Sequence, residues 1–364
     1  MPESCPVLLM TRSLGLGGSE RQLAEIAKAL DRSVFQPHVG CFHAEGFRAE
    51  ELRASGVPIV CLPVKSFRGP TLFTGALALG RYLQEHQIRL VHTFDVPLNL
   101  FGVPVARMFR TRRVISSQRA HRALTPGLRR QFLRLTDRLV DAIVVNSEAV
   151  RRDLVEVDRV PSRIIHLCYN GIDATLYPRR TESRQSPLVI GVICALRPEK
   201  GLATLLEGFA RLGRNREIRL LIVGSGPALA DLQALGRKLP LGDRCTFEPA
   251  VKDVARWLRR IDIFVLPSLS EAFSNSLMEA MACGCCVVAS RVGGNPELVV
   301  DQETGLLFRP GDSADLARAL ESLLEDNLLR EKLASAGAMR IREQFTIARA
   351  AERMAEIYRT VLDS

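Results

Sequence analysis

Hydrophobic runs and amphipathic segments alternate along the whole chain. Short apolar runs are typical of buried strands, and apolar positions that recur every three or four residues are typical of helices. In the first half, the predicted strands are 7–10, 37–42, 58–62, 90–94, 114–117, 142–145 and 163–168. The helical patterns that separate them include 20–30, 72–85 and 128–139. This alternation predicts a parallel sheet with helices on both faces.

The alternation stops at 173–187, a segment without a period that contains Pro178 and Pro187, and then starts again. The predicted strands of the second half are 188–194, 219–223, 245–247, 261–266 and 287–290, and its helices are 202–212, 228–239, 315–324, 328–343 and 347–362. We therefore predict an α/β protein of two Rossmann-like, doubly wound domains that face a central cleft, with ligands beyond the carboxyl ends of the strands. The predicted parts are an N-terminal Rossmann-like domain 1–173, a linker 174–187, a C-terminal Rossmann-like domain 188–343, and a C-terminal helix 344–364 that packs back toward the N-terminal domain.

Composition agrees with two soluble domains. The chain has 364 residues, of which 47% are hydrophobic and 25% charged, the usual balance of a globular protein. No apolar stretch reaches the ~18 residues of a membrane span. The first residues lack the basic region of a signal peptide. We expect a cytoplasmic protein.

The formal net charge is +10, and 44 of the 50 basic residues are Arg. The segment 107–138 contains ten Arg and one acid, Asp137. Such a segment attracts phosphates of lipid headgroups, anionic substrates or nucleic acid, and it is equally compatible with a solvated face. Because the chain has no helix-turn-helix, zinc-finger or RNP-type motif, we do not expect it to bind nucleic acid.

One helix of this basic segment has a second distinguishing feature. Within 128–139, Leu128, Phe132, Leu135 and Leu139 recur at helical spacing between arginines. A basic amphipathic helix suits an anionic membrane surface, which would make the protein peripheral on the inner face of the membrane. The alternative is a helix that packs its apolar side into the core.

The loop 15–20 follows the first strand and opens the first helix, so its amides could bind an anion. Glu20 occupies the place of the third glycine of the dinucleotide fingerprint, which disfavours a nicotinamide-dependent dehydrogenase. The following residues, from Ser19 to Gln22, match a capping box.

The loop 195–201 also lies between a strand and a helix. Its Arg197 can bind two phosphate oxygens and its Lys200 acts as a point charge, so the pair suits a diphosphate. The alternative is a charged turn at the start of a helix.

The loop 267–276 leads from a buried strand into a helix. Glu271 and Glu279 lie eight residues apart and could both accept hydrogen bonds from sugar hydroxyls, while the amides of 273–275 suit a phosphate. A capping box from Ser276 to Glu279 is the alternative explanation of Glu279.

Motifs in this half of the chain resemble the signature block of family-4 glycosyltransferases, which are retaining, sugar-nucleotide-dependent enzymes of the GT-B fold. The segments that carry the resemblance are 267–273, 279–284, 287–290 and 293–299. Further segments agree in order along the chain, and they are 17–20, 146–148, 169–173, 198–201, 223–227 and 304–307.

The resemblance implies roles by matching position. Glu271 would face the donor sugar, Lys200 would bind the diphosphate, and Arg197 would replace the arginine that the family usually has where this chain has Ala195. The implied donor-binding residues are Gly17, Gly18, Val251, Phe273, Ser274, Asn275 and Glu279, with Glu279 at the ribose and Val251 near the base. Arg119 and His121 follow a strand after which many members carry a sugar-contacting His, so they are candidates for contact with the acceptor or the sugar.

The resemblance also implies the reaction, with domain 1–173 on the acceptor side and domain 188–343 binding the nucleotide sugar. The donor would be a UDP- or GDP-sugar and the acceptor a hydroxyl group, lipid-linked in glycolipid, lipopolysaccharide or exopolysaccharide synthesis. No cofactor or metal is expected, and the chain has no Asp-x-Asp motif. The rival interpretation is a sugar-nucleotide epimerase of the same fold. Ala272 stands where the family usually has Gly, so the loop must avoid positive φ at that residue.

Overall fold

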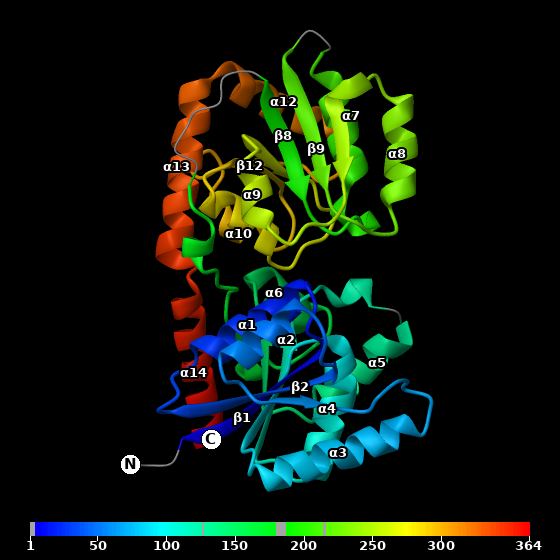
Figure 1. The fold of residues 1–364 in the computed structure, drawn as a ribbon, viewed down its shortest axis with the longest axis vertical. Helices are drawn as coiled ribbons and strands as arrows, with labels where there is room; N and C mark the ends of the chain where they lie inside the picture. The colour runs from blue at the N-terminus through cyan, green and yellow to red at the C-terminus, as the bar shows by residue number, and fades with distance from the viewer. Residues whose placement is uncertain (1–3, 126, 180–186, 214–215) are drawn as a thin grey trace. The chain divides into compact units, whose positions relative to one another are not determined.

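The computed structural model describes residues 4–125, 127–179, 187–213 and 216–364. The chain divides into two compact units (Figure 1). Unit 1 combines Met1–Gly171 with Ile347–Ser364, and unit 2 is Ile172–Thr346. Residues 180–186 of the predicted linker 174–187 lie outside the described residues.

Unit 1 is built on a parallel sheet. Within the described residues this sheet has seven strands in the order β3-β2-β1-β4-β5-β6-β7. Its strands are β1 (Cys5–Ser13), β2 (Phe35–His43), β3 (Ile59–Cys61), β4 (Leu90–Thr93), β5 (Arg113–Gln118), β6 (Ala142–Val145) and β7 (Ile165–Leu167). The strand order reverses between β1 and β4, the topological switch point at which doubly wound sheets bind ligands.

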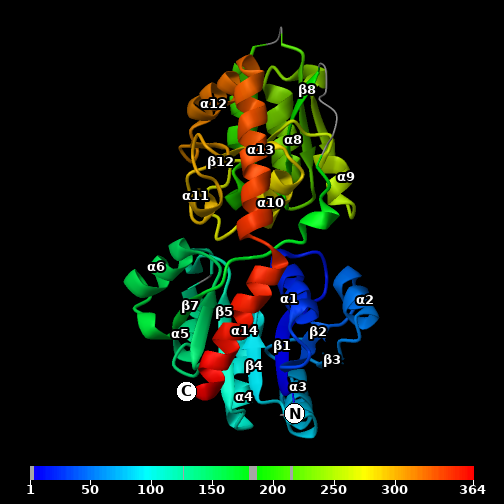
Figure 2. The same ribbon diagram turned by 90° about the vertical axis from the view of Figure 1, so that its left-hand side faces the viewer.

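The helices of unit 1 cover both faces of this sheet. They are α1 (Gly18–Ala29), α2 (Phe47–Ala54), α3 (Thr71–Glu85), α4 (Val96–Met108), α5 (Gly127–Thr136), α6 (Glu148–Glu156) and α14 (Ile347–Asp363). The last helix, α14, packs beside α1 and shares the core formed with β1 and β2 (Figure 2).

Tyr358 anchors α14 in this core. Its side chain is fully buried, and its ring meets the ring of Phe35 edge-on with centroids 5.7 Å apart. The Tyr358 hydroxyl lies 2.8 Å from His92 Nδ1, and His92 Nε2 lies 2.8 Å from Ser117 Oγ. Because this polar chain is buried and satisfied, α14 is an integral part of unit 1 rather than an appendage.

Unit 2 contains the second parallel sheet. Within the described residues it has six strands in the order β10-β9-β8-β11-β12-β13. They are β8 (Leu188–Ile193), β9 (Ile218–Val223), β10 (Cys245–Glu248), β11 (Ile263–Leu266), β12 (Cys286–Ser290) and β13 (Leu306–Phe308). The helices are α7 (Leu202–Arg211), α8 (Leu229–Lys238), α9 (Val254–Leu258), α10 (Asn275–Ala282), α11 (Asn295–Leu298), α12 (Ser313–Glu325) and α13 (Asn327–Gln344). The fold class is therefore the predicted one, with two Rossmann-like sheets.

Both predicted capping boxes are wrong. Helix α1 begins after Gly17, and no side chain caps it. Helix α10 begins after Ser274, whose Oγ accepts a hydrogen bond from the Leu277 amide at 3.3 Å. Ser276 therefore lies inside α10 and cannot be its N-cap residue, because an N-cap residue precedes the first helical turn.

Candidate functional site

Two loops meet at the switch point of unit 2. They are 194–201, which follows β8, and 267–274, which follows the neighbouring strand β11. The Leu269 amide donates to the Glu199 carbonyl at 2.8 Å, so the two backbones are joined directly. Gly201 has φ +62°, and a Cβ there would lie 2.2 Å from the Pro267 carbonyl oxygen. This close approach requires glycine.

The joined loops bring Lys200 and Glu271 together. Lys200 Nζ donates to Glu271 Oε2 at 2.5 Å. Both side chains are largely buried, with 19% and 13% of their surface exposed. Ser268 Oγ donates to the same carboxylate oxygen at 3.3 Å, and Ser290 Oγ holds the Ser268 carbonyl at 2.5 Å. Two residues separated by 71 positions in the sequence therefore form one charged centre.

The ion pair keeps Lys200 protonated. Burial by itself would lower the pKa of Lys200, but the Glu271 carboxylate outweighs that effect and raises the pKa above its usual value. The part of this stabilisation that depends on the charge of Lys200 is complete at neutral pH and is lost as the pH rises through the raised pKa of Lys200. A fixed ammonium group at the end of a central strand can attract the phosphates of a ligand.

Arg197 precedes this pair in the same loop. Its side chain is 62% exposed, and its Nη1 lies 3.9 Å from Glu199 Oε1. At that distance and exposure the contact is a weak, solvated ion pair. The guanidinium can therefore turn toward an anion at little cost.

Replacing Arg197 by alanine tests whether it takes over the charge that the family has at position 195. We expect a nucleoside diphosphate to bind about tenfold more weakly or worse, because a hydrogen bond to a charged group is lost. The melting temperature should stay the same, since the side chain is exposed. Calorimetric titration with UDP and GDP measures the effect, and Arg211→Ala, which removes an exposed arginine of α7, is the control. Parent-like binding would mean that Arg197 does not substitute for the missing arginine.

The segment that opens α10 has a well-defined backbone. The Phe273 side chain is buried, with its ring centroid 5.5 Å from that of Phe345. Ser274 caps the helix and Asn275 is its first residue. Ala272 has no positive φ, as its Cβ requires. The first amides of the helix point away from the helix body, so this end can receive an anion.

Glu279 is the fifth residue of α10, two residues beyond the position of a capping-box glutamate. Its side chain is buried, with 6% exposed. This position excludes the interpretation of Glu279 as a capping-box residue, because a side chain in the second turn cannot reach back to the N-cap amide. A buried carboxylate close to the helix start suits a ligand with hydroxyl groups.

We expect Glu279→Gln to raise the KM for the sugar nucleotide, or to lower kcat/KM, by about tenfold or more, since a charged acceptor of hydrogen bonds is lost. The melting temperature should change little, because Gln has the same shape. Steady-state kinetics and thermal melting together measure both effects. Glu207→Gln on the exposed side of α7 serves as the control. Unchanged donor kinetics would exclude a ribose contact.

Val251 lies in the loop after β10, two strands away from β8. The neighbouring Ala250 amide donates to Ser225 Oγ at 3.2 Å, which joins this loop to the one that follows β9. Both loops leave the same edge of the sheet as the Lys200 loop. The structure thus places Val251 at the same carboxyl edge of the sheet as Lys200. A contact between Val251 and a base stays a prediction.

The predicted residues of unit 1 lie at the carboxyl edge of its own sheet. Gly17 lies under the Glu20 carboxylate, which accepts from Ser13 Oγ at 3.0 Å. A Cβ on Gly17 would collide with that carboxylate, so this glycine allows the side chain to fold back over the loop. Gly18 is the first residue of α1.

Arg119 and His121 both have structural partners. Arg119 donates to Asn170 Oδ1 at 2.6 Å and lies over the Phe94 ring at 5.2 Å. Burial lowers its pKa to about 10. His121 Nδ1 lies 2.5 Å from Asp153 Oδ2. These contacts orient the two side chains, and a role toward the acceptor stays a prediction.

Three residues of the unit 2 site had no predicted role. They are Ser268 and Ser290, which fix the Glu271 carboxylate, and Gly201, which allows the two loops to touch. The first two lie in segments that resemble the family signature. Their function depends on which loops lie side by side, so no local pattern could have revealed it.

Comparison with known families agrees with this arrangement. The model for Glycosyltransferase Family 4 matches residues 16–176, and the model for Glycosyl transferases group 1 matches residues 173–340. The chain belongs to the family-4, group 1 glycosyltransferases. Together the two matches span residues 16–340, which include all the segments that carry the resemblance.

Individual relatives support the assignment. The chain is 30% identical over 210 residues to N-acetyl-alpha-D-glucosaminyl L-malate synthase of Bacillus anthracis, which covers 56% of this chain and 55% of that protein. It is 33% identical over 239 residues to D-inositol 3-phosphate glycosyltransferase of Stackebrandtia nassauensis, covering 60% and 54%. The chain thus spans about half the length of the curated relatives it matches.

The fold also agrees with solved structures. The crystal structure of Anabaena Alr3699/HepE in complex with UDP and glucose superposes with a TM-score of 0.85 over 97% of this chain and 99% of that one. The sequence identity is 21%, so this likeness supports the GT-B fold. Among the described residues, no helix is both long enough and apolar enough to cross a bilayer.

Proposed function

We propose that the protein transfers a sugar from a nucleoside-diphosphate sugar to a hydroxyl acceptor, with retention of the anomeric configuration. The observation that carries the proposal is the buried Lys200–Glu271 pair at the switch point of unit 2, beside the N-terminus of α10. Lys200 would bind the diphosphate and Glu271 the donor sugar. UDP is the first donor nucleotide to test, because a structural neighbour is described with UDP and glucose.

Electrostatics would drive the chemistry. Transfer breaks the bond between the sugar C1 and the phosphate oxygen, and negative charge develops on the departing nucleoside diphosphate. Lys200, Arg197 and the first amides of α10 would stabilise that charge. The acceptor oxygen would attack C1 from the side of the leaving group, and its proton would pass to the departing phosphate. Protein cations supply the compensating charge in this mechanism, so we propose that it needs no metal or other cofactor.

We further propose that the acceptor is lipid-linked, in glycolipid, lipopolysaccharide or exopolysaccharide synthesis. The support is the family resemblance together with an exposed helix face in unit 1, described in the next subsection. Arg119 and His121 in the same unit are the candidate contacts of the acceptor.

The test is an incubation with radiolabelled UDP- and GDP-sugars in the presence and absence of a membrane extract. Extract-dependent transfer of label into lipid or glycan is the expected result. Release of a changed sugar or sugar nucleotide without an acceptor would instead indicate an epimerase. An intact donor under both conditions would contradict the proposed function.

A further inference from the structure

Helix α5 exposes its apolar side. Leu128, Phe132 and Leu135 are 72%, 55% and 54% exposed, and Leu124 before the helix and Leu139 after it are also exposed. Successive residues turn by ~100° around a helix, so Leu128, Phe132 and Leu135 form one narrow stripe along α5, and Leu124 and Leu139 lie beyond its two ends. The alternative of a core-packed helix is therefore wrong for this stripe, since α5 buries Leu133 and Thr136 instead.

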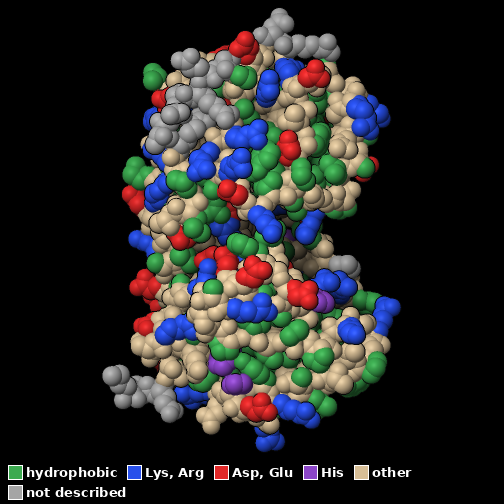
Figure 3. Space-filling model, viewed as in Figure 1, with side chains coloured by type: hydrophobic (Ala, Val, Ile, Leu, Met, Phe, Trp, Pro, Cys, Tyr) green, Lys and Arg blue, Asp and Glu red, His purple; other side chains and the backbone are tan. Residues whose placement is uncertain are grey.

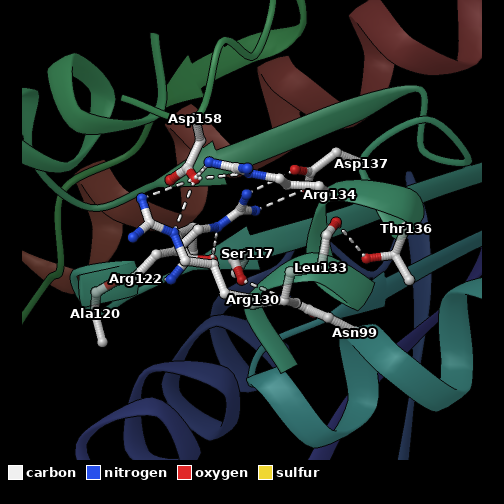
Figure 4. Close-up of polar contacts among 11 residues, drawn as sticks. Asn99, Ser117, Ala120, Arg122, Arg130, Leu133, Arg134, Thr136, Asp137 and Asp158 are labelled. Carbon is white, nitrogen blue, oxygen red and sulfur yellow. Dashed lines mark hydrogen bonds and ion pairs between the residues drawn. The ribbon is translucent and has the colours of Figure 1, made fainter. Parts of the chain in front are cut away.

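Polar contacts on the other side hold α5 in this orientation. Arg122 forms a buried, two-pronged ion pair with Asp137, with both bonds at 2.7 Å. Arg130 and Arg134 converge on Asp158, which is 2% exposed (Figure 4). Buried ion pairs with good geometry fix the position of the elements that they join. These contacts therefore hold α5 with its apolar stripe facing outward.

A second anchor holds the chain just after α5. Arg107 Nε donates to the Leu139 carbonyl at 2.5 Å, and its Nη2 lies 2.7 Å from Asp141 Oδ2. Together with Arg113, which lies 3.5 Å from Asp141, these contacts occupy much of the predicted basic segment in internal pairs. The outward charge of the segment is therefore smaller than its ten arginines suggest.

Cations nevertheless border the stripe. No hydrogen bond or ion pair in the described part of the chain engages the side chains of Arg129 and Arg138. Arg134 is half exposed and shares a single carboxylate with Arg130. Arg129 and Arg138 are exposed, and in the sequence Arg129 directly follows Leu128 and Arg138 directly precedes Leu139. By the helical period, Arg134 lies on one flank of the stripe. In the space-filling view, Lys and Arg side chains stand beside hydrophobic ones over the region of α5 (Figure 3).

We propose that this face of α5, formed by Leu124, Leu128, Phe132, Leu135 and Leu139 with the flanking Arg129 and Arg138, docks onto an anionic lipid bilayer. The apolar stripe enters the boundary between headgroups and acyl chains, and the arginines bind lipid phosphates beside it. A second copy of this chain is a poor occupant, because a two-fold contact brings the same arginines of two proteins of net charge +10 together. This proposal stands on the geometry of α5 and does not depend on the proposed catalysis.

Vesicle flotation tests the docking with the full chain and without any substrate. We expect binding to vesicles that contain phosphatidylglycerol at least about tenfold stronger than to vesicles of phosphatidylcholine alone. Phe132→Ser should weaken the binding about tenfold or more. Arg129→Ala and Arg138→Ala should each weaken it about fivefold. All three side chains are exposed, so the melting temperatures should match that of the parent protein.

Matched controls are Leu328→Ser, which removes a leucine of α13 that is more exposed than Phe132, and Arg32→Ala, which removes an exposed arginine of unit 1. Both should bind vesicles as the parent does. Equal binding to the two kinds of vesicle, no binding to either, or unchanged binding of the Phe132→Ser variant would overturn the proposal. Sedimentation without lipid tests whether a second copy of the chain occupies this face instead. A dimer of the parent protein that the Phe132→Ser variant does not form would also overturn the proposal. UDP binding by unit 2 is measured separately. A failed flotation would therefore remove one support of the lipid-linked acceptor and leave the proposed sugar transfer untouched.

Discussion

Replacing Lys200 by alanine is expected to weaken the binding of UDP or GDP by about 10- to 100-fold, because a hydrogen bond from a charged group is lost. The Glu271 carboxylate would then face the diphosphate without its partner, which adds repulsion to the loss. The value of kcat should fall as well, since Lys200 would stabilise charge that develops in the transition state. Calorimetric titration and steady-state kinetics measure these effects.

Two further variants make the Lys200 result specific. Lys252→Ala removes an exposed lysine from the same unit and should leave binding unchanged. The double variant Lys200→Ala with Glu271→Gln removes both charges, and it should bind the nucleotide better than Lys200→Ala alone, because the repulsion is gone. Parent-like binding by Lys200→Ala would show that the ion pair is structural and that the diphosphate binds elsewhere.

Tyr358→Ala is expected to lower the free energy of unfolding of unit 1 by about 3–5 kcal/mol, the usual cost of removing a large buried aromatic side chain. Tyr358→Phe should cost about 1–3 kcal/mol, because it keeps the ring and leaves His92 Nδ1 without its hydroxyl partner. Calorimetry of thermal unfolding measures both values.

Unit 2 gives the internal control for Tyr358. Its core contains no part of α14, so it should still bind UDP at a temperature at which unit 1 of the Tyr358→Ala variant has melted. Leu328→Ala, which truncates an exposed side chain, should melt as the parent does. An unchanged unfolding profile of Tyr358→Ala would contradict the assignment of α14 to the core of unit 1.

The alternation of strands and helices was the most informative pattern in the sequence. The predicted strand 142–145 coincides with β6 because four consecutive apolar residues are buried on both faces of a parallel sheet. Strand β13, Leu306–Phe308, was not predicted as a strand, because its apolar run is confined to these three residues between Gly305 and Arg309. The equally short β3 and β7 lie within longer predicted runs. Helix starts were less predictable. Ser274 and Ser276 are both acceptable caps by composition, and the path of the preceding loop selects Ser274.

The candidate site was partly predictable for a similar reason. Each loop had a pattern of its own, and the family resemblance joined Lys200 and Glu271 by function. Their direct contact depends on β8 and β11 being neighbours, which the strand order determines and local sequence does not. The stripe on α5 is a case in which the sequence pattern was recognised but the exposure of its apolar side was not. Its period is the same whether the apolar side enters a core or faces outward, so exposure required the structure.

The position of α14 in the core of unit 1 sets the order in which the two units can be completed during synthesis. Residues 1–171 leave the ribosome first, yet their sheet lacks Met354, Ile357 and Tyr358 until the chain has been extended beyond residue 358. In the sequence, unit 2 lies entirely between these two pieces. Its sheet can therefore form before α14 has been synthesised and unit 1 is complete. Translation thus completes the second unit before the first, the reverse of the usual order in which the N-terminal domain matures first. Throughout that interval, the apolar surface that α14 later covers is open to chaperones on the nascent chain.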